Sequence, residues 1–490
     1  ASDPLANASI PGGGHGVGTL AQPTVEEEFF FSGSTDVFNY DAFPASRGAN
    51  PGDRLIHYKT AQPYKTRMLV RRPATAAAFS GDVVIEMMNS SANFDSTPAW
   101  LPSAEYFARE GIVYVGVTTS GNQSIPFLKG GCGGVQPPCG SRYTSLSITD
   151  NGQEYEIISQ LATALKSGDP EQIPLPAAFA PVQHVFLSGQ SQQGGSVITY
   201  ASQFHFPGIA GYFFMGASSA RAIRGGFTAF GDATSRTCGT AGAPAYPDCV
   251  APLTGLEVRV RTDLPVPVYR GSSETDIGNG STRQDDTNTS AFASFRLIEV
   301  PATSHNLVHD FDFAPGLPFS SLCVAQPYSL ADGPIFGSHV WNAMWENMRL
   351  QVTQGLQPPM APRVLIVGGA IQRDLAMNAI GGVRLPELDV PTNSYFSPNN
   401  QGKPACGSPG APPPPGCIPP ELSFIANLAC GLNGSYVAFT PEVLDALYPD
   451  HGKYVSEIAK RTNQLVKRRF LLPEDAELHK EAAGESPLGH

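Results

Sequence analysis

Between residues 81 and 217 the sequence alternates short apolar runs with segments of helical periodicity. The runs "GDVVIEMMN" (81–89), "IVYVGVTT" (112–119), "HVFLSG" (184–189) and "IAGYFFMGA" (209–217) are typical of buried strands. Helical patterns separate them at "SAEYFAREG", "NGQEYEIISQLATALKSG" and "GGSVITYASQFH". Strands that alternate with helices predict an α/β fold, with a mainly parallel central sheet flanked by helices on both faces.

Further strand-like runs flank this region. The segments "VEEEFFFSGST", "LIHYKT" and "YKTRMLVRRP" alternate in polarity, as expected for strands at an antiparallel edge. Two later runs, "PVPVYRG" (265–271) and "FRLIEVP" (295–301), are predicted as buried strands, and residues 221–261 as an insertion. We therefore expect an α/β core over residues 25–310.

The pattern changes beyond residue 310. A helical stretch "HVWNAMWENMRLQV", a short strand "RVLIVGG", a Pro-rich loop at 404–420 and a terminal helical region follow one another. No segment of flexible composition separates them from the core. Residues 311–490 are therefore expected to form a C-terminal extension packed on the core, so that residues 1–490 make a single unit.

Composition and charge exclude some partners. The chain has 490 residues, a formal net charge of −12 and only 15% charged residues. Nucleic acids and anionic membranes need basic patches, so neither is expected as the main partner. No run of about 18 apolar residues occurs, so no membrane-spanning helix is expected.

Eight cysteines indicate disulfides. Three close pairs bracket loops rich in Gly and Pro, and the two remaining cysteines pair by elimination. The predicted pairs are Cys132–Cys139, Cys238–Cys249, Cys406–Cys417 and Cys323–Cys430. A metal site is not expected, because no CxxC or HExxH motif and no His at ligand spacing from a Cys occurs. Disulfides place the protein in an oxidising compartment, secreted or periplasmic.

The segment "LSGQSQQGGSV" (187–197) is the strongest candidate for chemistry. It joins a predicted strand to a predicted helix, with Ser191 between small residues. A nucleophilic serine needs a sharp strand-to-helix turn of this kind, in which small neighbours relieve crowding. The strict G-x-S-x-G pattern is broken at Gln193, and Gly194 comes one residue later. The alternative is a turn whose Ser191 only caps the helix.

Partners for a nucleophilic Ser191 follow in the order serine, acid, histidine. Glu274 and Asp276 come after the strand at 265–271, and His305 comes after the strand at 295–301. The base would take the proton from the serine hydroxyl, and the acid would orient the imidazole. His309 is the alternative base. Spacing from Gly271 favours Glu274 as the acid, with Asp276 as second choice or supporting partner.

An oxyanion hole needs two backbone N–H groups. One normally belongs to the residue after the nucleophile, here Gln192. The other normally comes from the loop after the third core strand, where Ser90 and Ser91 are the candidates. The alternative is that "NSSANF" is only a polar turn.

Several blocks also resemble a known family. The segments "EEEFFFSG", "YKTRMLVRRP", "VVIEMMN", "GIVYVGVTT", "SGQSQQGG", "SETDI", "GGVRLPELDVP" and "LYPDHGKYV" are similar, in order, to those of bacterial alpha/beta hydrolase domain proteins. The resemblance covers nearly the whole chain. It implies an α/β-hydrolase fold, a carboxylic-ester hydrolase without a cofactor, and an extension that belongs to the catalytic unit. Gln192 matches the Gln that family members carry after the nucleophile, whereas Gln193 departs from the smaller residue expected there.

These features together predict a secreted serine esterase. Ser191 would attack a small-molecule or polymeric ester, and an acyl-enzyme would form and be hydrolysed. One alternative is an extracellular depolymerase of polyesters of the polyhydroxyalkanoate type, for which an open apolar groove would be expected. Another is a non-catalytic binding protein on a hydrolase scaffold.

Overall fold

The structure is a computed structural model. It describes residues 20–40, 55–91, 93–131, 141–169, 172–224, 236–253, 258–278, 280–305, 322–325, 337–396, 401–406, 416–420 and 423–489. The chain forms two compact units, Ala1–Val268 and Tyr269–His490. This boundary falls inside the predicted 25–310 core. The predictions of a core over 25–310, an extension over 311–490 and one catalytic unit stay predictions.

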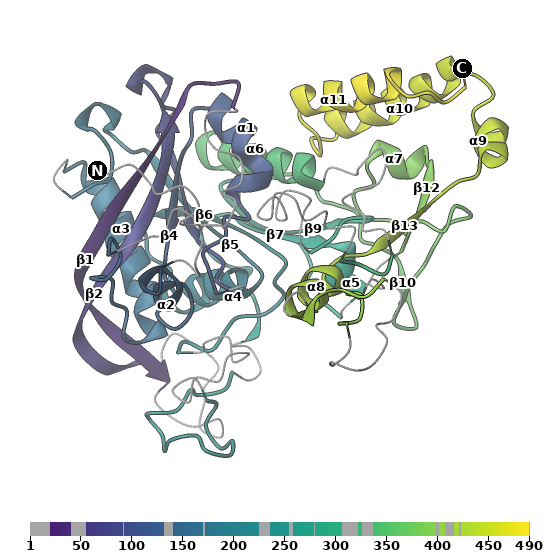
Figure 1. Cartoon of the computed structure of the whole chain (residues 1–490). Helices are drawn as coiled ribbons and strands as arrows, with labels where there is room; N and C mark the ends of the chain where they lie inside the picture. Colours follow the sequence, from purple (N-terminus) through teal and green to yellow (C-terminus); the bar gives the residue numbers. More distant parts are fainter. Residues whose placement is uncertain are drawn as a thin grey trace. The chain divides into compact units, whose positions relative to one another are not determined.

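The first unit contains a mixed sheet in the order β1-β2-β4-β3-β5-β6 (Figure 1). Its strands are β1 (Thr24–Tyr40), β2 (Leu55–Pro73), β3 (Asp82–Met87), β4 (Val113–Val117), β5 (His184–Gln190) and β6 (Ile209–Met215). The pairs β3–β4, β3–β5 and β5–β6 are parallel, and β1–β2 and β2–β4 are antiparallel. The predicted parallel strands and antiparallel edge are therefore confirmed, with "LIHYKT" and "YKTRMLVRRP" joined in one long strand.

The three predicted helices between these strands are confirmed as α1 (Trp100–Arg109), α3 (Glu154–Ser167) and α4 (Gln192–Thr199), which continues as a π-helical turn over Tyr200–Phe204. The short helix α2 (Ser124–Lys129) was not predicted. Gly168 ends α3 in the left-handed region, with φ of 69°, where a side chain would be strained. Parallel neighbours with helices between them give the first unit its α/β character.

The second unit contains a sheet in the order β7-β9-β8 (Figure 1). Its strands are β7 (Val268–Ser273), β8 (Thr287–Ser290) and β9 (Ala293–Val300), and α5 (Glu274–Gly278) follows β7 directly. The larger helices are α6 (Gly337–Gln354), α8 (Ser423–Gly431), α9 (Pro441–Leu447), α10 (His451–Lys467) and α11 (Pro473–Gly484). Shorter elements are β10 (Ile366–Val367), β11 (Ala370–Ile371), α7 (Pro386–Asp389), β12 (Asn393–Phe396) and β13 (Ser435–Ala438).

The predicted strand "RVLIVGG" is shorter than expected. Gly368 and Gly369 both have positive φ and turn the chain back, so that only Ile366–Val367 pair with Ala370–Ile371. Packing explains part of the apolar run, because Val364 belongs to a buried cluster with Ile277 and Ala379, and Ile366 packs against that cluster. Among the described residues, no helix combines the length and the hydropathy needed to span a membrane.

Three of the four predicted disulfides are confirmed. Cys238–Cys249 lies in the first unit, and Cys323–Cys430 and Cys406–Cys417 lie in the second. Cys132 and Cys139 lie outside the described residues, so their pairing stays a prediction. By the loop-entropy account, closing an 11-residue separation stabilises the folded state by about 3 kcal/mol.

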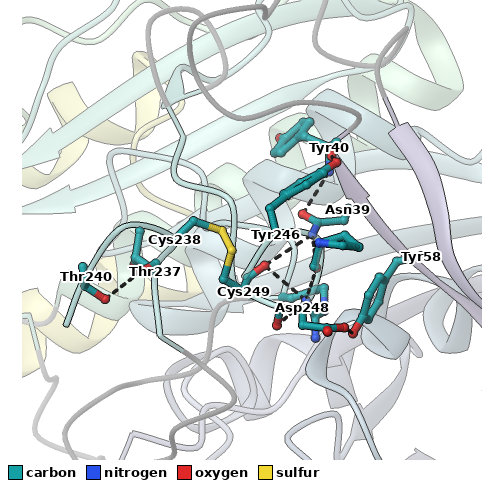
Figure 2. Close-up of a disulfide and its surroundings, with 11 residues drawn as sticks. Asn39, Tyr40, Tyr58, Thr237, Cys238, Thr240, Tyr246, Asp248 and Cys249 are labelled. Carbon is teal, nitrogen blue, oxygen red and sulfur yellow. Dashed lines mark hydrogen bonds between the residues drawn. A yellow bond between two sulfur atoms is a disulfide. The ribbon is translucent and has the colours of Figure 1, made fainter. Parts of the chain in front are cut away.

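The Cys238–Cys249 disulfide closes a loop that is also held by hydrogen bonds (Figure 2). The Tyr58 hydroxyl of β2 donates to the Asp248 carboxylate. Two further bonds join the loop to the end of β1, from the Tyr246 hydroxyl to the Tyr40 carbonyl and from Asn39 Nδ2 to the Pro247 carbonyl at 3.0 Å. The covalent closure and these bonds fix a segment that contains no regular helix or strand among its described residues, 236–253.

A buried histidine connects three helices of the second unit. His479 of α11 has its Nε2 2.9 Å from Nδ1 of His339 in α6, and its own Nδ1 contacts the Glu387 carboxylate of α7. Burial lowers the pKa of His479, but the charges of Glu387 and Asp475 outweigh burial and raise its pKa above the usual value. The imidazolium therefore holds α11 against its neighbours.

This cluster predicts a pH-dependent stability. A raised folded-state pKa gives stabilisation that is fully present below the unfolded value of about 6.5 and lost as pH rises through the folded pKa. We expect the free energy of unfolding to fall across that range, because the folded protein then loses the proton that His479 binds more tightly than the unfolded chain does. Urea unfolding of the wild type and of His479→Gln across this pH range measures it.

The variant His451→Gln is the matched control, because it removes a histidine of the same C-terminal region, at the start of α10. It should keep the pH dependence that His479→Gln loses. Equal pH dependence in all three proteins would show that the cluster does not titrate in this way.

Candidate active site

Ser191 has an unusual backbone conformation at the junction of β5 and α4. Its φ is 56° and its ψ is −119°, a combination that residues other than glycine rarely adopt. The Ser191 N–H donates to the Met215 carbonyl at the end of β6 (2.8 Å), and its carbonyl accepts from the Gly195 N–H (3.0 Å). Such a strained strand-to-helix turn is the conformation that exposes a nucleophilic serine. The Ser191 side chain makes no capping hydrogen bond to α4, so the helix-cap alternative is not supported.

Two glycines make this turn possible. A Cβ on Gly189 would lie 2.6 Å from the Gln193 carbonyl oxygen, and one on Gly194 would lie 2.8 Å from the Ala217 Cβ. Neither contact is sterically tolerable, and both neighbours belong to the backbone or a short side chain. The requirement for a small residue therefore falls three residues after Ser191 rather than two, which explains the shifted pattern.

Gln193, where a smaller residue was expected, is accommodated by a polar network that the sequence did not predict. It is buried, its Nε2 donates to Thr119 Oγ1 (2.8 Å), and its Oε1 accepts from Arg221 (3.4 Å). The same network contains the buried Glu154, which accepts from the Ser196 hydroxyl at 2.9 Å. Burial raises the pKa of Glu154, although the nearby Arg221 opposes this. Gln193 thus points into the protein and does not crowd the turn.

The predicted oxyanion-hole residues lie together in the first unit. The Ser90 hydroxyl is 2.9 Å from Gln192 Oε1, and both side chains contact the Gln123 amide oxygen. The Ser91 N–H donates to the Asn89 side chain (2.8 Å), so it is already used. Asn89 in turn donates to the Gln190 carbonyl (2.9 Å), which ties the loop after β3 to the end of β5. This geometry favours the Ser90 N–H over that of Ser91.

A cavity of about 590 Å³ lies in the first unit. Its lining mixes polar and apolar surface and comprises Tyr58, Lys59, Gly121, Asn122, Ile148, Thr149, Asp150, Asn151, Arg224, Gly242, Ala243, Pro244 and Asp248. Asn122 precedes Gln123, the residue that contacts both Ser90 and Gln192. Three of the lining residues, Gly242–Pro244, and Asp248 belong to the loop closed by the disulfide in Figure 2.

In the second unit, Asp276 and His305 form a close pair. His305 Nδ1 lies 2.5 Å from Asp276 Oδ1, and the two side chains are only 9% and 11% exposed. The other carboxylate oxygen of Asp276 accepts from the N–H and the hydroxyl of Ser273, at 2.8 and 2.7 Å. The His305 N–H donates to the Thr275 hydroxyl (2.6 Å). Asp276 is therefore held in place by the last residue of β7, and the backbone of His305 by a residue of α5.

The electrostatics of Asp276 favour a carboxylate. Burial raises its pKa, but the charge and hydrogen bond of His305 and the donors of Ser273 outweigh burial and bring the pKa below the ordinary value. An ionised acid hydrogen-bonded to a ring nitrogen can fix the tautomer of the imidazole and stabilise an imidazolium.

The structure brings Asp276, and not the preferred Glu274, to His305. Residues 274–278 form the helix α5, whereas the spacing argument assumed an extended loop. Side chains two residues apart point to different sides of a helix, so Glu274 and Asp276 diverge. Glu274 is fully buried and accepts from the Ala302 N–H and from Arg373, both at 2.7 Å. The alternative base His309 lies outside the described residues.

A family model described as "Alpha/beta hydrolase domain" matches residues 5–481 of the chain. No curated protein matches it. The family match agrees with the observed α/β architecture, a mostly parallel sheet flanked by helices.

Three solved structures illustrate the similarity. A protein assigned as a carboxylesterase from Lactobacillus plantarum is 13% identical, over 51% of this chain and 76% of that one, with a TM-score of 0.28. An α/β serine hydrolase without a lid from Xanthomonas campestris is 13% identical, over 56% and 86%, with a TM-score of 0.25. A fungal esterase from Rhizomucor miehei is 10% identical, over 41% and 47%, with a TM-score of 0.22, so less than half of its length is matched. At these scores the similarities carry no argument about substrate.

The network around Gln193 yields a prediction. Gln193→Ala removes the buried amide that bonds to both Thr119 and Arg221. We expect a loss of about 1–3 kcal/mol in the free energy of unfolding, because two buried hydrogen bonds are lost and each contributes about 0.5–1.5 kcal/mol. Urea denaturation measures it. Gln172→Ala, at an exposed Gln, is the control and should change the stability by less than about 0.5 kcal/mol. Equal stability of the two variants would contradict the supporting role of the network.

Proposed function

The chain belongs to the alpha/beta hydrolase domain family, and from this premise we propose that it is a serine esterase that cleaves carboxylic esters through an acyl-enzyme. The observation that carries the proposal is the strained, left-handed backbone of Ser191 between β5 and α4. Strain of this kind persists only where the surrounding structure enforces it, and it is concentrated at functional sites.

The proposed reaction gives each residue one role. Ser191 Oγ attacks the ester carbonyl while His305 takes its proton, and a tetrahedral oxyanion forms. The backbone N–H groups of Ser90 and Gln192 stabilise that oxyanion. His305 then protonates the leaving alcohol as the C–O bond breaks. Water, deprotonated by His305, hydrolyses the acyl-enzyme and releases the acid.

Asp276 is the proposed acid of the mechanism. Its support is the 2.5 Å contact with His305 Nδ1 together with the two donors of Ser273, which keep the carboxylate ionised and oriented. With Nδ1 bonded to Asp276, the Nε2 of His305 is the nitrogen available to exchange a proton with the serine.

The proposed substrates are small-molecule or polymeric esters, and none of the residues given a role in the reaction is among those that line the cavity of the first unit. The three disulfides support a secreted or periplasmic location, because such bonds persist in oxidising compartments.

The nucleophile is tested by Ser191→Ala. We expect the kcat for p-nitrophenyl esters to fall by about 10⁴-fold or more, since the covalent step is lost. A fluorophosphonate probe should label the wild type at Ser191 and should not label the variant, as read by peptide mass spectrometry. Ser167→Ala, at the end of α3, is the control and should keep full labelling. A wild type that the probe does not label would favour a non-catalytic binding protein.

The acid is tested by Asp276→Asn. The amide keeps the shape of the side chain but has one acceptor oxygen in place of two and carries no charge. The imidazole therefore loses its orientation and its counter-charge. We expect kcat/KM to fall by about 10³–10⁴-fold, with the free energy of unfolding measured alongside. Activity within a few-fold of the wild type would remove Asp276 from the mechanism.

A further inference from the structure

Glu274 is a buried carboxylate that the proposed reaction does not use. It is fully inaccessible to solvent, and it accepts hydrogen bonds from two segments distant in sequence. One donor is the N–H of Ala302, in the turn between β9 and His305 (2.7 Å). The other is Arg373, 99 residues away (2.7 Å). Burial of an ionised carboxylate is costly unless charge and hydrogen bonds compensate it, so this arrangement requires both donors.

The first donor belongs to a strained turn. Ala302 has φ of 56°, in the left-handed region that an alanine rarely occupies. The same turn is joined to the start of α5 at two more points, where the Thr275 hydroxyl accepts from the His305 N–H (2.6 Å) and the Thr275 N–H donates to the Thr303 carbonyl (3.4 Å). Glu274 therefore stabilises a backbone conformation that His305 depends on.

The second donor extends this connection to the C-terminal region. Arg373 donates from Nη2 to Glu274, and from Nη1 to the carbonyls of Met377 (3.0 Å) and Tyr395 (2.6 Å). Its planar guanidinium thus binds one carboxylate and two backbone carbonyls in a fixed geometry. Burial raises the pKa of Glu274, and the charge of Arg373 opposes that increase.

We propose that Glu274 is a positioning residue for the Asp276–His305 pair, and that Arg373 of the C-terminal region completes it. The inference rests on the proposed function. The helix α5 holds His305 from two sides, because Asp276 binds the imidazole ring while Glu274 and Thr275 bind the backbone of the turn that carries it. Misplacement of a catalytic group by about 1 Å can lower the rate by about 10²-fold. Contacts that fix the position of His305 therefore affect the rate.

The test is the double variant Glu274→Gln/Arg373→Met. It removes one negative and one positive charge, so the net charge near His305 is unchanged. The variant loses the ion pair between residues 274 and 373 and the bonds from Arg373 to the carbonyls of Met377 and Tyr395. We expect kcat to fall by about 10–100-fold while KM changes by less than about two-fold. The ascending limb of the pH profile of kcat/KM should move to lower pH, because an imidazolium that contacts Asp276 less closely loses its proton more easily.

A second ion pair of the same unit provides a matched control. Asp286 also accepts from one backbone N–H, that of Leu297 (2.9 Å), and from one arginine of the C-terminal region, Arg363 (2.6 Å). It lies before β8 and has no contact with the turn of His305 among the described residues. Asp286→Asn/Arg363→Met should therefore lower stability without moving the pH profile. The rate of each variant is divided by its folded fraction, which circular dichroism measures at the temperature of the assay.

If the double variant does not fold, Glu274→Gln serves, since it leaves no buried carboxylate without its ion-pair partner, keeps an amide oxygen for the Ala302 N–H and should lower kcat to a smaller extent. A readout independent of turnover is the downfield proton NMR signal of the imidazole N–H bonded to Asp276. This signal should be present in the wild type, absent in Asp276→Asn, weakened in the Glu274/Arg373 variant and kept in the control.

The outcomes separate the two proposals. An unchanged NMR signal together with a pH profile like that of the control overturns the positioning role of Glu274. A wild type that cleaves no ester overturns the proposed function, yet loss of the NMR signal in the Glu274/Arg373 variant would still support the positioning role. Full activity of Asp276→Asn with an inactive Glu274→Gln would make Glu274 the acid and overturn both assignments.

Discussion

The left-handed backbone of Ser191 is the constraint on which the arrangement of the first unit depends. A serine adopts φ of 56° only if the surrounding contacts repay the strain. Three features stabilise this conformation. They are the hydrogen bond from the Ser191 N–H to the Met215 carbonyl, the tight backbone packing that Gly189 and Gly194 allow, and the polar network that contains Gln193. Parallel strands on either side, β3 and β6, bring their following loops to the same edge as the turn.

The second unit shows how the C-terminal region takes part in the candidate site. Buried carboxylates near β7, β8 and β9 pair with arginines that come later in the chain or with the backbone of the 361–384 segment. Glu274 binds Arg373, Asp286 binds Arg363, and Glu299 accepts from Arg283 and from the Val364 N–H. The region beyond residue 310 is therefore part of the core of this unit.

Sequence periodicity predicts the elements of the fold because burial imposes it directly. The strands of the first unit and the Gly168 end of α3 follow from apolar spacing and from the conformational freedom of glycine. Three disulfides follow from the spacing of cysteines around Gly- and Pro-rich loops. The strand-to-helix turn at Ser191 also follows from its local pattern, because the steric need for small residues is local.

The choice between Glu274 and Asp276 could not be made in this way. It depends on whether the residues after β7 are extended or helical, and five residues are too few to show a period. The role of Gln193 could not be predicted either, since its partners Thr119 and Arg221 are distant in sequence. Arg373 gave no signal at all, because a single arginine in a loop is usually a surface residue.

Three interior glutamates share one physical role. Glu86 of β3 accepts from the N–H groups of Ala99 and Trp100 and so fixes the start of α1. Glu154 accepts from Ser196 in α4, behind the Ser191 turn, and Glu274 accepts from Ala302 before His305. Burial raises the pKa of each of the three, for Glu86 to about 8, and their hydrogen-bond donors oppose that rise. A buried carboxyl group with several fixed donors favours one geometry, because displacement of a donor leaves a buried polar group unsatisfied at a cost of about 1–3 kcal/mol. The chain has few charged residues, and three of them are buried glutamates that each fix the conformation of a helix or a turn. The proposed nucleophile and base each lie next to one of these sites.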